Sequence, residues 1–165
     1  MIRANQSCLR QAVDLLDRLD DNQYRSPRGS WSPVGAQLRH VIEHYQCFLD
    51  GVAAGRIDYD SRRRDPAIES SRATARATLV DLAGRLDALA AEPVSRTLAV
   101  QLQCDVADPN GCWSNSTIGR ELQFLVSHSV HHFALIKLLL APDQVALPEE
   151  FGTAPSTLAH SRTEG

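Results

Sequence analysis

The stretch that decides the fold spans residues 121–140 and reads ELQFLVSHSVHHFALIKLLL. Its apolar residues recur every three to four positions, which predicts a helix that begins around residue 116 or 117 and continues to about Leu140. At about 100° per residue, His128 and His132 lie within about 40° of each other on this helix. The pair is therefore predicted to face the core, within the same arc as Phe124, Leu135 and Leu139.

Two imidazoles buried side by side in an apolar seam are unfavourable unless their nitrogens have partners. Histidines four residues apart on a helix can each direct one nitrogen at a single metal ion, which satisfies both rings. Hydrogen-bonded core histidines are the alternative, and for a lone histidine they would be the better explanation. The pair His128 and His132 predicts a metal site. His131 lies toward one edge of the stripe, and its role stays open.

A second pair of histidines lies on another predicted helix. Ser32 followed by Pro33 is a strong helix start, because serine caps the first turn and proline is compatible with it. The helix is expected to continue to about residue 54, and it carries His40 and His44 on one face, one turn apart. Periodicity alone does not decide which of the two is the third metal ligand. The other is left as a hydrogen-bonding partner or a proton carrier.

Two further helices and a β-hairpin complete the predicted fold. Helical spacing of leucines predicts helices over about 3–19 and 67–90. Residues 98–104 alternate between apolar and polar, which is a strand signal, and the DPNG sequence at 108–111 predicts a turn. We therefore expect an all-α fold, a four-helix bundle with a small β-hairpin inserted between helices three and four.

Length and composition set limits on the class of protein. A chain of 165 residues fits one domain over 1–165, with an irregular tail from about 148. The net charge of −3 argues against nucleic-acid binding. No stretch approaches the roughly 20 apolar residues of a membrane span, and no signal-peptide core is present, so a cytoplasmic protein is expected. Four scattered cysteines fit free thiols, and Cys47, near the face of His44, fits a small core residue better than a metal ligand.

These segments resemble the DinB/YfiT-like family of metal-binding four-helix-bundle proteins across essentially the whole chain. The resemblance rests on LRH at 38–40, in the helix that follows the WSP start at 31–33, and on ELQF running into SHSVHH over 121–132. The last segment contains the H-x-x-x-H motif of the family. The stretch 58–64, with DYD and three arginines, and FGTAPSTL at 151–158 are typical of one branch of that family.

The resemblance implies that His40 joins His128 and His132 in binding one divalent metal ion, zinc, nickel or iron. It also implies frequent homodimers and the use of low-molecular-weight thiols. Three histidine ligands leave positions open for water or substrate. We therefore expect a metal-dependent enzyme that activates a small thiol, as an S-transferase does, or water, as a hydrolase does, on a small-molecule substrate, with His44 as the acid/base candidate. A non-catalytic metal-stabilised bundle acting as a stress-associated binding module is the alternative.

Two features allow two interpretations each. Glu121 lies two turns before His128 on the same face and could orient a ligand histidine, although interaction with the positive end of the helix dipole is the better explanation. The run Arg62–Arg64 could bind an anionic substrate, although a solvated loop is the better explanation.

Overall fold

The computed structural model describes residues 1–107 and 111–163, and this part of the chain is mostly helical, as predicted. The long helices are α1 (Ile2–Arg18), α3 (Val34–Gly51), α5 (Arg72–Asp87) and α6 (Ile118–Leu140). The short ones are α2 (Asp21–Arg25), α4 (Pro66–Ser70) and α7 (Pro155–Ser161), and 3-10 turns cover Ala88–Ala91 and Ala141–Asp143.

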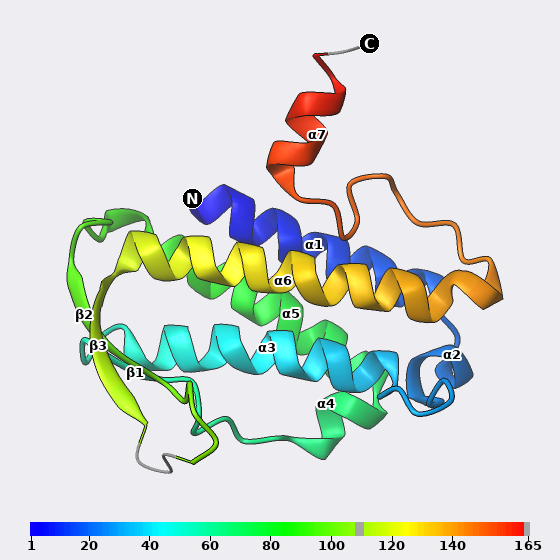
Figure 1. Ribbon diagram of the computed structural model, residues 1–165, viewed down its shortest axis with the longest axis horizontal. Coiled ribbons are helices and arrows are strands. Elements are labelled where there is room, and N and C mark those ends of the chain that lie inside the picture. Colours follow the sequence, from blue (N-terminus) through cyan, green and yellow to red (C-terminus); the bar gives the residue numbers. More distant parts are fainter. Residues whose placement is uncertain (108–110, 164–165) are drawn as a thin grey trace.

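The four long helices run alongside one another, with the strands at one end and α2 at the other (Figure 1). Helices α1 and α3 each contact both α5 and α6. The apolar stripes meet between them, where Leu16 of α1, Leu38 and Ile42 of α3 and Leu82 of α5 are fully or almost fully buried. Each such side chain contributes about 1.5–3 kcal/mol of burial free energy, which holds α1, α3 and α5 together.

A three-stranded sheet of order β1-β2-β3 closes one end of the helices: β1 (Arg56–Asp58), β2 (Thr97–Leu102) and β3 (Cys112–Thr117). Strands β2 and β3, which lie between α5 and α6 in the sequence, pair in antiparallel fashion, with Leu102 opposite Cys112. Most of the predicted turn lies at 108–110, outside the described residues. The parallel strand β1, which pairs with β2, was not predicted, because three residues are too few to show a period. The chain is therefore helical with a small sheet, rather than all-α with a hairpin alone.

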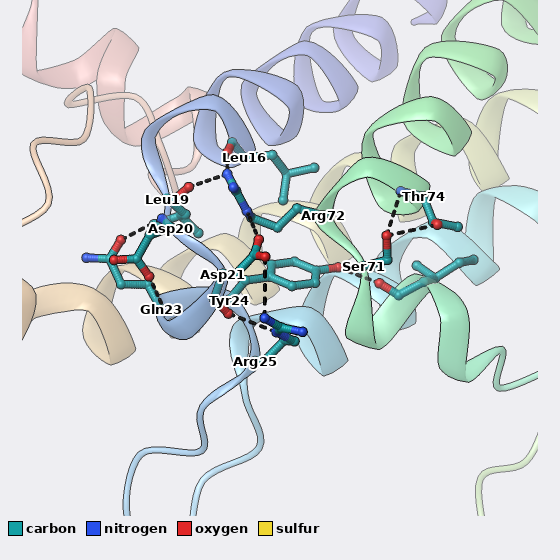
Figure 2. Close-up of polar contacts among 11 residues, drawn as sticks. Leu16, Leu19, Asp20, Asp21, Gln23, Tyr24, Arg25, Ser71, Arg72 and Thr74 are labelled. Atoms are coloured by element: carbon teal, nitrogen blue, oxygen red, sulfur yellow. Dashed lines mark hydrogen bonds and ion pairs between the residues drawn. The ribbon is translucent and has the colours of Figure 1, made fainter.

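The helix predicted over 67–90 is divided at Ser71, whose extended backbone (φ −129°) separates α4 from α5. The Ser71 hydroxyl caps α5 by accepting a hydrogen bond from the Thr74 amide. Figure 2 shows that the side chain of the next residue, Arg72, extends to the C-terminal end of α1. Its guanidinium donates to the Leu16 carbonyl at 3.0 Å, to the Leu19 carbonyl and to Asp21 at 2.7 Å. Arg72, the first residue of α5, thus links α5 to the end of α1.

The tail from residue 148, predicted to be irregular, contains helix α7, which extends away from the other helices in Figure 1. Before it, Phe151 is buried and stacks on Phe133 of α6 with ring centroids 4.8 Å apart. Gly152 has φ +71°, and a Cβ there would come within 2.6 Å of the Ala134 amide nitrogen. The tail is therefore held against α6 just before α7 begins.

By length and composition, the segment Ile118–Asp143 would also be able to cross a membrane. The central helix of a globular bundle meets the same criteria. In this fold α6 contacts α1 and α3, and 33% of its most apolar window is buried, so length and composition alone are weak evidence for a membrane span.

Candidate metal centre

Four histidine side chains meet where α3 packs on α6. The ring centroid of His40 lies 5.0 Å from that of His128 and 4.6 Å from that of His132, and His44 lies 4.0 Å from His128. Within the described residues, one group could hold a metal ion: His40, His128 and His132, each offering one ring nitrogen, all within 4.8 Å of one another. The structure thus groups His40, and not His44, with the α6 pair.

Gln37 fixes the orientation of one of these rings. Its side-chain oxygen lies 2.7 Å from Nδ1 of His132. An amide oxygen accepts only, so Nδ1 of His132 carries the proton and Nε2 keeps its lone pair. A hydrogen bond of this kind sets the tautomer of a metal-binding histidine and holds its ring in place. Gln37 was not predicted as a site residue, although it lies three residues before His40, on the same face of α3.

His128 has a polar atom without a partner. Its Nδ1 is buried and has no hydrogen-bond partner within the part of the chain that the structure describes. Leaving such a group unsatisfied costs about 1–3 kcal/mol. Phe124 stacks on the ring at a centroid distance of 5.4 Å, which covers one face with apolar surface. A metal ion coordinated by this Nδ1 would relieve the arrangement, because coordination replaces the missing hydrogen bond.

Burial keeps all four rings neutral. It lowers the pKa of His40 and His132 from 6.5 to about 4, that of His44 to about 3 and that of His128 to about 2. The positive charge that each ring would carry if protonated also disfavours protonation of its neighbours. Neutral imidazole is the form that binds metal ions, so at neutral pH the cluster is in its ligating state.

The second α3 histidine, His44, is almost fully buried, at 2% exposure. Its Nδ1 lies 2.7 Å from the His40 carbonyl oxygen, so Nδ1 donates, and Nε2 lies 3.5 Å from Nη1 of Arg62, which can only donate. His44 is therefore a neutral ring whose lone pair faces an arginine. Its predicted acid/base role stays a prediction.

Tyr59 and Glu121 form the polar wall beside His44. The Tyr59 ring stacks on His44 at 5.3 Å, and its hydroxyl donates to Glu121 at 2.9 Å. The other oxygen of Glu121 accepts from the Ser116 hydroxyl at 2.5 Å. Glu121 lies in the first turn of α6, where it also faces the positive end of the helix dipole, and it holds Tyr59 rather than a histidine. Tyr59 was missed, because no periodicity links a loop residue to a helical site.

The remaining candidates lie outside the three-histidine group. His131 is exposed, with its ring centroid 5.2 Å from that of His132. Cys47 is half-buried, and burial raises the pKa of its thiol to about 11, so it stays protonated at neutral pH. All four cysteines are free, and Cys104 and Cys112 are exposed at the hairpin.

Comparison with known proteins places the chain in a family. Over 108 residues the chain is 28% identical to "FK506-binding protein 5" of Rhizopus delemar. The matched region covers 66% of this chain and 28% of that protein. The matched region is thus less than a third of that relative. The family model of the DinB superfamily matches residues 5–136, a span that includes all three histidines of the group. The chain belongs to the DinB superfamily.

Proposed function

We propose that the four long helices form a DinB-type bundle that binds one divalent metal ion through His40, His128 and His132, and that the ion serves a reaction on a small molecule. The observation that carries the proposal is the convergence of three neutral ring nitrogens from α3 and α6, within 4.8 Å of one another.

The residues present suit such an ion. His132 is held by Gln37 in the tautomer that leaves Nε2 free, and the buried Nδ1 of His128 has no partner among the described residues. Three imidazoles without a thiolate or carboxylate are ligands for zinc, nickel or iron. They also leave coordination positions open, which is the arrangement of catalytic rather than structural sites.

When bound, the metal would supply Lewis acidity, which makes a water molecule or a thiol more acidic. The protein's own residues define the surroundings. Phe124 and Tyr59 limit water access on the side of His128 and His44, since both rings pack against these histidines. His44 presents its Nε2 lone pair toward Arg62 and can accept a hydrogen bond there, whereas burial lowers its pKa to about 3 and makes it a weak base at neutral pH. A thiol transferase or a hydrolase is the reaction class that we propose.

The test is the metal content of untagged protein purified without chelator, measured by elemental mass spectrometry. Wild type should contain about one equivalent of zinc, nickel or iron, and the His128→Ala/His132→Ala variant should contain none. His131→Ala is the matched control, since it removes an exposed histidine of the same helix and should keep the metal. Absence of metal from wild type, even after reconstitution with each ion, would contradict the proposal.

A non-catalytic, metal-stabilised bundle is the second candidate. It is favoured by the position of the three histidines, because an ion there would cross-link α3 to α6. The two candidates differ in coordination. A catalytic ion keeps an exchangeable water, visible as proton relaxation enhancement with a paramagnetic substitute, whereas a structural ion is fully enclosed by protein atoms.

Homodimer formation, cytoplasmic location and the absence of membrane or nucleic-acid partners stay predictions. Light scattering of the purified protein gives the oligomeric state directly.

A further inference from the structure

We infer that Arg62, in the arginine loop of residues 59–65, forms an anion-binding subsite beside the three histidines, and that the small molecule bound there carries a carboxylate. This inference rests on the proposed function, since it concerns the ligand of the same site. Arg63 and Arg64 are exposed, as expected of a solvated loop, but the side chain of Arg62 is half-buried against a histidine.

The loop is fixed at both ends. At its start, the Tyr59 amide donates to the Gln101 carbonyl of β2 at 3.0 Å, and the Tyr59 hydroxyl donates to Glu121 of α6. At its end, the Asp65 amide donates to Glu43 at 2.7 Å. Glu43 is a carboxylate of α3 with only 2% exposure. A loop held by two helices and a strand positions its side chains with little loss of entropy on binding.

Within this loop, Arg62 folds toward the histidines. Its Nη1 donates to the Tyr59 carbonyl and lies 3.5 Å from Nε2 of His44. The His44 ring is in turn 4.4 Å from His40 and 4.0 Å from His128, measured between centroids. The guanidinium is therefore one ring away from the proposed metal ligands, close enough to contact a small molecule held there.

The arginines near the histidines differ in their partners. Arg63 pairs with Asp50 at 3.6 Å and Arg39 pairs with Glu69 at 2.9 Å. Across residues 1–107 and 111–163, Arg62 and Arg64 have no ion-pair partner, and Nε of Arg39 is buried without a hydrogen bond. Two guanidinium charges are thus left uncompensated on this side of the cluster.

The charge of these arginines reaches the histidines. Nη1 of Arg62 lies 3.5 Å from Nε2 of His44, and charges this close interact strongly away from bulk water. A divalent ion bound by neutral histidines would add two further positive charges to the same place. A ligand with a carboxylate offsets this excess, and the planar fork of arginine matches a carboxylate in two hydrogen bonds.

The test uses the cobalt(II)-loaded protein, whose visible absorption reports ligands near the ion. Acetate is titrated at constant ionic strength, with acetamide as the uncharged probe of the same shape. Acetate should change the spectrum and acetamide should not. Arg62→Gln should weaken acetate binding about tenfold, because one charged hydrogen-bond partner is lost. Arg63→Gln, which makes the same change one residue away, should bind acetate within about twofold of wild type.

Cobalt uptake by each variant shows that the site is folded, and Arg62→Lys, which keeps the charge, should bind acetate more tightly than Arg62→Gln. Cobalt uptake with equal acetate affinity in wild type and Arg62→Gln would overturn the anion subsite and leave the metal site intact. Failure of the wild type to bind cobalt would overturn the proposed function itself and the subsite with it.

Discussion

The contact of α1 with α5 and the contact of α3 with α6 both contain polar side chains, but they satisfy them differently. Beside α1, Arg72 finds two carbonyls and a carboxylate of the protein, and Arg76 pairs with Asp17 at 3.1 Å. Between α3 and α6, the buried Nδ1 of His128 has no partner among the described residues. Polar groups that are satisfied internally hold helices together, whereas unsatisfied ones in a buried cluster indicate a ligand.

The largest expected difference between the two contacts is the response to metal. Zinc at about 100 times its dissociation constant should raise the melting temperature of metal-free wild type by about 5–10 °C. The His128→Ala/His132→Ala variant should not respond, because its ligands are gone. Differential scanning fluorimetry measures both. An equal shift in the double variant would place the binding site elsewhere.

Breaking the other contact should change stability and leave metal binding intact. Arg72→Ala removes the hydrogen bonds to Leu16 and Leu19 and the ion pair with Asp21, so it should cost about 1–3 kcal/mol of unfolding free energy. Urea denaturation measures the loss, and elemental analysis should still find about one equivalent of metal. Loss of metal in this variant would mean that the two contacts are coupled.

Within the α3–α6 contact, Gln37 holds the ring of one proposed metal ligand, His132. Gln37→Leu removes the acceptor that fixes His132, and it should weaken metal affinity about 10- to 100-fold in competition with a chromophoric chelator. Gln37→Glu keeps an acceptor at the same position and should retain most of the affinity. If Gln37→Leu bound metal as tightly as wild type, the orienting role of Gln37 would be wrong.

Acid should weaken the α3–α6 contact of the metal-free protein. The folded pKa values of His40 and His132 are about 4, below the usual 6.5, so between these limits the unfolded chain binds more protons than the folded one. The stability that these neutral histidines contribute is fully present above about pH 6.5 and falls as the pH is lowered toward 4. The unfolding free energy, measured by urea denaturation at each pH, should depend less steeply on pH in the His128→Ala/His132→Ala variant. A slope as steep as that of wild type would contradict the assignment to these rings.

The smallest effect is expected at the surface. Arg76 and Asp17 form an ion pair whose side chains are 50% and 55% exposed. Arg76→Ala should change the unfolding free energy by less than about 1 kcal/mol, because solvent screens such pairs. A loss as large as that of Arg72→Ala would show that exposure does not separate the two arginines.

The sequence predicted the parts of the molecule that repeat with a helical period. The pairs His40 and His44 and His128 and His132 were located because residues four apart share a helix face. The choice of His40 as the third member came from the family resemblance; the structure brings His40 together with the α6 pair in a group that could hold a metal ion, and its role as a ligand stays a prediction. Periodicity could not make that choice, since both rings of α3 lie on the same face.

What escaped prediction depends on contacts between distant segments. Strand β1 pairs with β2 over only three residues, and Tyr59 reaches Glu121 across 62 positions of sequence. The break at Ser71 was hidden because apolar spacing continues on both sides of it. Arg62 looked like a solvent-exposed charge, and its position beside His44 follows only from the anchoring of the loop by β2 and Glu43.

The most direct test of the central claim is anomalous diffraction from crystals of the zinc-loaded protein, collected on both sides of the zinc absorption edge. One strong anomalous peak is expected between α3 and α6, in contact with ring nitrogens of His40, His128 and His132. A peak bound by other residues, or no peak between these helices, would contradict it.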